Sequence, residues 1–144
     1  MTFASLVSLA ACSPQPGEAP QSNTIETVKA QPAKADVPSL EGSWRVTRID
    51  GQDAAGLGVT ATLGAGKARL ATGCLRRAWT YRQDRNMVSF TSSPGGSANC
   101  GRAPSGLEET AYSAIDQANI VIFASGGKQA DLSGTGGNLT FERR

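Results

Sequence analysis

Three cysteines carry the most specific chemistry in this 144-residue chain. A cysteine side chain can be acylated, can bind a metal as a thiolate, or can pair in a disulfide bond. The chain contains no histidine, which removes the Ser-His-Asp and Cys-His catalytic arrangements in their usual forms and every common zinc site that uses histidine. We therefore expect a protein that is not an enzyme and that needs no metal and no cofactor.

The first cysteine, Cys12, directly follows an uncharged segment of small and apolar residues. The preceding Leu9-Ala10-Ala11 resembles the bacterial lipobox, in which a branched apolar residue and two small residues stand before a lipidated cysteine. Residues 1–11 then form a partial lipoprotein signal peptide, because the apolar run is short and lacks the usual positive start. We expect the true start codon to lie upstream of Met1. The alternative is an ordinary cysteine in a frayed N-terminus.

Residues 12–39 are rich in proline, alanine, glutamine, serine and threonine. Their few large apolar side chains cannot bury enough surface to offset the entropy lost on ordering. This composition predicts a flexible, partly extended tether. With Cys12 lipidated, the tether would hold a folded domain at a membrane surface.

From Leu40 onward, short segments of alternating polar and apolar residues are separated by glycine-rich turns. The strands expected from this pattern are 42–49, 59–63, 67–74, 77–82, 87–91, 120–124, 128–133 and 138–142. Residues 40–144 therefore predict one domain that is mainly β, a small antiparallel barrel.

One helix is expected in the C-terminal third of the domain. Ser105 and Glu108 have the spacing of a capping box, in which each side chain hydrogen-bonds the other residue's backbone amide. The apolar face of this helix is formed by Leu107, Ala111, Ile115 and Ala118. Asn119 is a reasonable stop.

The other two cysteines, Cys74 and Cys100, lie inside the predicted domain. In an exported protein they meet an oxidising compartment and can pair in one way. A disulfide there would stabilise the fold by about 3–4 kcal/mol in the chain-entropy model. Free or redox-active thiols remain the alternative, although the sequence has no C-x-x-C spacing.

Arg76, Arg77, Arg82 and Arg85 cluster in the sequence, with Arg102 farther along. They could form a basic patch for anionic lipid headgroups or for an acidic partner. We favour a solvated strand face and turn, with the arginine stems covering apolar surface. The net charge of +2 is too small to indicate nucleic-acid binding.

Three aromatic residues, Trp44, Trp79 and Tyr81, could line a ligand pocket inside a small barrel. We favour the interpretation that they fill its core. The turn residues Asp50, Asp53 and Asp84 do not form a metal or acid–base set.

Several segments together resemble the META domain of HslJ-type lipoproteins. They are Leu40-Glu-Gly42-Ser-Trp44, Gly73-Cys74, Ala98-Asn-Cys100 and Gly137-Asn-Leu139-Thr-Phe141. The resemblance implies a lipocalin-like β-barrel with one helix, an envelope location and no established enzymatic activity. Relatives are linked to stress and antibiotic tolerance. One departure is Leu75, which stands where the family has asparagine.

These observations predict an envelope lipoprotein, held by its lipid in the outer membrane and facing the periplasm. Its domain would bind or stabilise another envelope component. One alternative is a carrier of a small apolar ligand inside the barrel. Another is a periplasmic protease inhibitor that uses the N-terminal segment. The sequence leaves the oligomeric state open.

Overall fold

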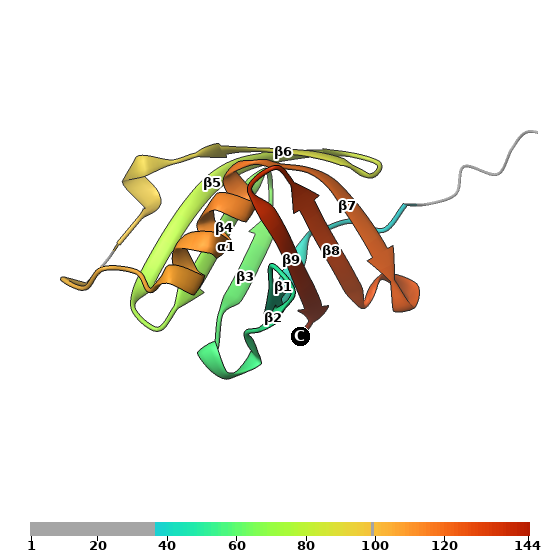
Figure 1. The fold of residues 1–144 in the computed structure, drawn as a ribbon. Helices are drawn as coiled ribbons and strands as arrows, with labels where there is room; N and C mark the ends of the chain where they lie inside the picture. Colours follow the sequence, from blue (N-terminus) through green and yellow to red (C-terminus); the bar gives the residue numbers. More distant parts are fainter. Residues whose placement is uncertain (1–36, 99) are drawn as a thin grey trace, which may run out of the picture. The chain divides into compact units, whose positions relative to one another are not determined.

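The computed structural model describes residues 37–98 and 100–144. Cys12, the predicted signal peptide and most of the predicted tether lie outside the described residues. The elements of the described part are β1 (Gly42–Ile49), β2 (Gln52–Asp53), β3 (Thr60–Gly64), β4 (Lys67–Thr72), β5 (Leu75–Asp84), β6 (Met87–Ser92), α1 (Gly106–Asp116), β7 (Ala118–Ala124), β8 (Gln129–Gly134) and β9 (Gly137–Arg143) (Figure 1).

The strands form one antiparallel sheet that closes into a barrel. Each strand from β3 to β9 pairs with the next in chain order, and β1 pairs with both β3 and β9. The two-residue β2 adds to the edge of β1. The predicted fold class is confirmed: a mainly β, antiparallel barrel of eight strands with one α-helix in the C-terminal part.

Strand β1 contains a bulge that decides which of its side chains point inward. Its register against β9 shifts between Val46 and Arg48, so Thr47 is the extra residue. A bulge of one residue changes the phase of the alternation. Trp44, Val46 and Ile49 are therefore all buried, although the last spacing is three rather than two.

The barrel interior holds a single cluster of buried apolar side chains. Trp44, Trp79 and Tyr81 all belong to it, as the core interpretation predicts. The ring of Trp44 tilts against Phe141 with centroids 6.2 Å apart, and Tyr81 stacks on Phe90 at 5.8 Å. The aromatic side chains therefore pack against other core residues.

Helix α1 begins as predicted and ends earlier than predicted. The capping box of Ser105 and Glu108 is present. The expectation that Ala118 continues the helix and Asn119 stops it was wrong, because Ala118 pairs with Gly134 at the start of β7. Strand pairing here overrides the helical pattern. Strand β5 also starts at Leu75 rather than at the predicted Arg77.

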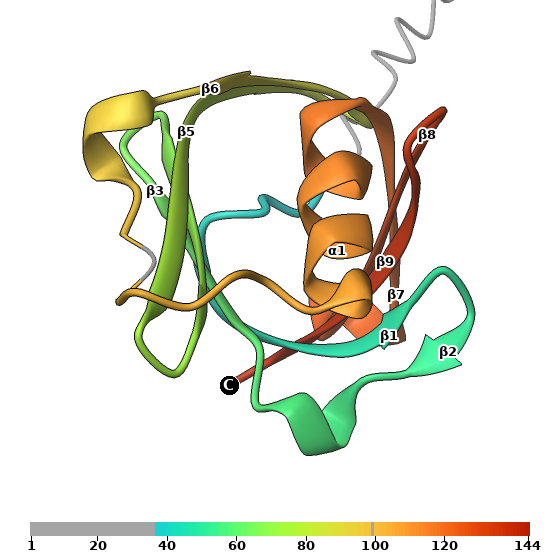
Figure 2. The same cartoon turned by 60° about the vertical axis from the view of Figure 1, so that its left-hand side comes forward.

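Glycines let α1 lie directly against the turn between β8 and β9. A Cβ atom at Gly136 would overlap the carbonyl oxygen of Ser113, and one at Gly134 would overlap that of Gln117. No larger residue fits at this approach without moving the helix or the turn. Figure 2 shows α1 beside β8 and β9. We call the end of the barrel where α1 contacts the β8–β9 turn the helix end.

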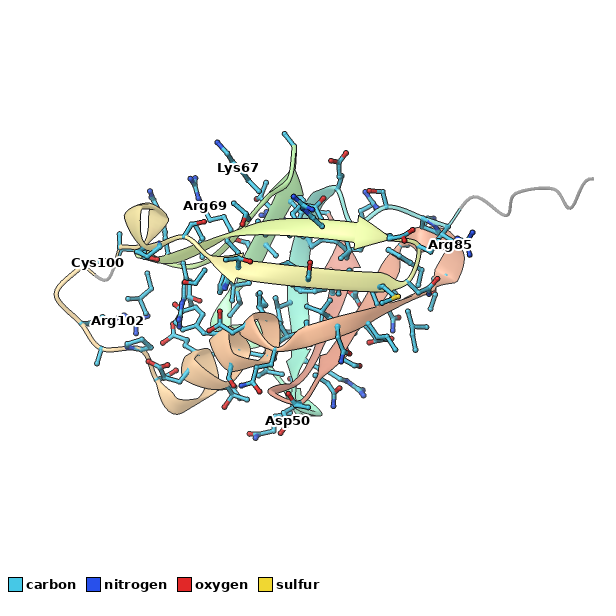
Figure 3. The ribbon with its side chains drawn as sticks, turned by 90° about the horizontal axis from the view of Figure 1, so that it is seen from above. Asp50, Lys67, Arg69, Arg85, Cys100 and Arg102 are labelled. Atoms are coloured by element: carbon cyan, nitrogen blue, oxygen red, sulfur yellow. A yellow bond between two sulfur atoms is a disulfide. The ribbon has the colours of Figure 1, made fainter. Side chains whose placement is uncertain are left out.

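The chain enters the barrel at the opposite end, which we call the Pro38 end. The side-chain oxygen of Gln83 accepts a hydrogen bond from the amide of Leu40 at 2.9 Å, and its amide group donates to the carbonyl of Pro38 at 3.0 Å. Gln83 lies at the end of β5, beside the turn to β6. Figure 3 places Arg85, in that turn, far from Cys100 and Arg102 at the other end.

Candidate functional site

The disulfide between Cys74 and Cys100 brings a long loop to the helix end of the barrel. The two Cα atoms are 6.0 Å apart, and the predicted pairing is supported. Arg76 and Ala98 extend the connection through two backbone hydrogen bonds of 2.7 and 2.9 Å. The loop before α1 therefore lies against the first residues of β5.

The same loop is held to α1 by a buried carboxylate. Glu108 is only 3% exposed, and its two oxygens accept from the guanidinium of Arg102 at 2.8 and 2.9 Å. The amide of Ser105 also donates to Glu108 at 2.7 Å. Hydrogen bonding to Arg102, and secondarily to Ser105, lowers the pKa of Glu108 to about 2 against the opposing effect of burial. Sequence analysis found the capping role of Glu108 but not its ion pair.

A second charged group lies where α1 ends over β5. Asp116 accepts a hydrogen bond from the indole N–H of Trp79 at 2.5 Å and pairs with Arg77 at 3.2 Å. The Arg77 guanidinium also lies 5.1 Å from the ring centre of Tyr112 and 5.9 Å from that of Trp79. Arg77 is thus fixed by one carboxylate and two aromatic rings.

Arg77 and Tyr112 line a pocket of about 340 Å³, which we call the helix-end pocket. Its lining is Leu75, Arg76, Arg77, Ser97, Ala98, Pro104, Glu109 and Tyr112. Burial, with the nearby Glu108 and Glu109 carboxylates, raises the pKa of Tyr112, so its hydroxyl stays protonated. The pocket therefore offers guanidinium donors, a carboxylate acceptor and an aromatic surface. That set suits binding of a polar group.

The structure does not gather the four arginines of the predicted basic patch at one place. Arg77 and the exposed Arg76 both line the helix-end pocket, whereas Arg82 is exposed farther along β5, outside that lining. Arg76 and Arg82 are about 20 Å apart along the strand. Arg85 lies in the turn at the Pro38 end.

The described residues contain neither a candidate metal site nor a candidate membrane-spanning helix. Among residues 37–98 and 100–144, no three histidine, cysteine, aspartate or glutamate side chains are grouped so that they could hold a metal ion. No helix in this part of the chain is long and apolar enough to cross a membrane.

Comparison with known proteins identifies a similar fold. No protein-family model matches the chain, and no curated protein matches it. A solved DUF4847 family protein from Bacteroides vulgatus is 12% identical, with a TM-score of 0.50 over 72% of this chain and 93% of that chain. An NMR structure of a protein from Burkholderia xenovorans is 25% identical, with a TM-score of 0.49, and covers 72% of this chain and 82% of that one. The likeness to the Bacteroides protein extends to the fold alone.

Proposed function

We propose that this protein is a lipoprotein of the bacterial cell envelope whose META-like barrel binds another envelope protein and performs no catalysis. Cys12 carries the lipid, and residues 13–39 connect it to the barrel. The anchor lies in the outer membrane, with the barrel in the periplasm.

The observation that carries this proposal is the Cys74–Cys100 disulfide. Disulfides persist in oxidising compartments such as the periplasm and are rare in the cytosol. This agrees with the lipobox-like residues before Cys12. Two cysteines serve the fold, and the third is left for the lipid.

The helix-end pocket is the proposed contact for the partner. It combines the fixed guanidinium of Arg77 with the exposed carboxylate of Glu109 and the ring of Tyr112, a mixture of charged and aromatic groups that suits a protein interface. It lies at the end of the barrel opposite to the Pro38 end, where the connection to Cys12 begins. A barrel anchored through that connection can present the pocket away from the membrane.

Site-directed photo-crosslinking tests this proposal in intact cells. A photoreactive amino acid at Ser97, which lines the helix-end pocket, should give one reproducible protein adduct. The matched control is the exposed Asn138 on β9, which lies outside the pocket. Equal adducts from both positions, or none from Ser97, would count against the pocket as a partner site.

A charge-reversal variant shows whether the adduct formed at Ser97 depends on the helix-end pocket. Arg76→Glu reverses an exposed charge at the pocket and should abolish the Ser97 adduct. Arg48→Glu makes the same charge change on β1 and should leave the adduct intact. An adduct that survives Arg76→Glu would show that the partner does not use this charge.

A further inference from the structure

We propose that the Pro38 end of the barrel is a membrane-docking surface, which binds the phospholipid surface through exposed apolar side chains flanked by arginines. The surface consists of Met87, Ile120, Ile122, Arg82 and Arg85, and we call it the Met87 surface. The proposal rests on the proposed function, because the lipid on Cys12 would bring the barrel to a membrane.

The apolar part of the Met87 surface is an unusual exposed cluster. Met87, Ile122 and Ile120 have exposed fractions of 68%, 56% and 44%. Among the described residues one other large apolar side chain, Leu57, is exposed to a comparable degree. Met87 pairs directly with Ile120 across the two strands, and Ile122 is the next outward residue on β7. Exposed apolar side chains gathered in this way mark an interaction site more often than scattered ones do.

The cluster lies where β6 and β7 meet, and these two strands pair over a short length. The β6–β7 ladder contains one register pair, Met87 with Ile120. Asn86 extends it through hydrogen bonds of 2.8 Å from its side-chain amide to the Val121 carbonyl and from the Val121 amide to its own carbonyl. Strand β7 then continues past the first residue of β6, so Ile122 has no β6 residue beside it.

Charged groups of both signs lie beside the cluster, and its arginines can contact anionic headgroups. Arg82 and Met87 line a surface hollow of about 500 Å³, which also contains Gln83, Asp84, Val88 and Ser89. Arg85 follows in the turn. The ion pairs formed within the described part of the chain use Arg77 and Arg102, which leaves the guanidinium groups of Arg82 and Arg85 to other partners. Asp84 lies in the hollow opposite Met87, and Asp131 pairs with Ile122, so Arg82 and Arg85 are the cationic groups of a surface of mixed charge.

The membrane is the occupant that best fits the position of the surface. Gln83, which lines the hollow, also holds the backbone of Pro38 and Leu40 where the chain enters the barrel. The described chain begins at Val37, at the same end of the barrel as the Met87 surface. Apolar side chains that enter the interface, with arginines beside them, would add to the anchoring by the lipid.

Vesicle binding by the full chain with Cys12→Ser tests the surface without the lipid. This chain should cosediment with vesicles of phosphatidylglycerol and phosphatidylethanolamine, and less with phosphatidylcholine alone. Met87→Thr, Ile120→Thr and Ile122→Thr together should lower the partition coefficient at least about tenfold. The single Ile122→Thr variant should lower it less and guards against a folding defect in the triple variant.

Matched control variants show whether vesicle binding depends on the Met87 surface or on the overall number of apolar and charged residues. Leu57→Thr removes the other exposed apolar side chain and should leave binding unchanged. Arg82→Gln with Arg85→Gln should weaken binding to the anionic vesicles and reduce its salt dependence. Arg45→Gln with Arg48→Gln lowers the net charge equally on β1 and should have a smaller effect.

Three outcomes would overturn the proposal. One is vesicle binding by the triple variant equal to that of its parent. Another is an equal loss in the Leu57→Thr control. The third is a dimer in solution that the triple variant abolishes while neither protein binds vesicles, which would assign the Met87 surface to a second copy of the chain. Lipid on Cys12 is measured separately by mass, so loss of the anchor and loss of the surface give different results.

Discussion

The carboxylate of Glu108 and the guanidinium of Arg102 form a two-point ion pair, with N–O distances of 2.8 and 2.9 Å, at the start of α1. Glu108 is also the partner of Ser105 in the capping box. One buried side chain therefore closes the helix terminus and holds the disulfide-bonded loop. Pro104, which lies between Arg102 and Glu108 in the sequence, lines the helix-end pocket.

The lowered pKa of Glu108 predicts an acid-dependent loss of stability. Its folded pKa of about 2 lies below the value near 4.3 expected for an unfolded chain. The stabilisation is therefore complete above about pH 5 and is lost as the pH falls towards 2. Urea unfolding across this range should show the decline. Glu108→Gln should lower the free energy of unfolding at pH 7 by about 2 kcal/mol and flatten this part of the profile.

The neighbouring Glu109 provides the control for that experiment. It is exposed on the same turn of the helix and has no partner in the capping box. Glu109→Gln should leave the acid profile unchanged. An identical profile for both variants would contradict the role assigned to Glu108.

Removal of the disulfide should weaken the fold substantially. Cys74→Ser with Cys100→Ser opens a loop with a sequence separation of 26 residues. The free energy of unfolding should fall by about 3 kcal/mol, because the denatured chain gains conformational freedom. Urea denaturation of the double variant measures this, with Cys12→Ser as the unaffected control. A stability equal to the parent's would show that the two cysteines are not paired.

Asp116 should stabilise the fold by accepting the hydrogen bond from Trp79 as well as by pairing with Arg77. Asp116→Ala leaves the buried indole N–H of Trp79 without its acceptor and should cost about 1–3 kcal/mol. Asp116→Asn keeps an acceptor oxygen and should cost less. Thermal unfolding followed by tryptophan fluorescence reports both changes. Equal losses in the two variants would mean that the ion pair with Arg77, and not the indole hydrogen bond, is the stabilising contact.

The approach of α1 to the β8–β9 turn predicts a sensitive glycine. Gly136→Ala places a methyl group on the carbonyl oxygen of Ser113 and should destabilise the protein by about 2 kcal/mol. Gly56→Ala is the control, since a Cβ there meets no atom within 4 Å. Comparable midpoints of thermal unfolding for the two variants would rule out close packing at this position.

Local patterns predicted the strands well because each buries alternate side chains. The inward positions of Trp79 and Tyr81 follow from their spacing alone, and the capping box marks the start of α1 from two residues. The end of α1 could not be read in this way, because Ala118 suits a helix face and is placed in β7 by its pairing with Gly134.

Contacts between distant segments account for the features that sequence analysis missed. The acceptor for the Trp79 indole is Asp116, 37 residues away, and Gln83 holds the backbone of Pro38, 45 residues away. No local spacing relates these residues. The Arg102–Glu108 pair is closer in sequence, but it depends on how the disulfide turns the loop. The Met87 surface likewise exists only because β6 and β7 meet.

The three cysteines are divided between the membrane and the fold, and this division is the central feature of the proposed function. Intact mass spectrometry of protein extracted from membranes, under non-reducing conditions, measures this directly. The account predicts a chain that begins at Cys12 and carries lipid mass on it, with Cys74 and Cys100 joined. An unprocessed chain without lipid, recovered from the soluble fraction, would contradict it.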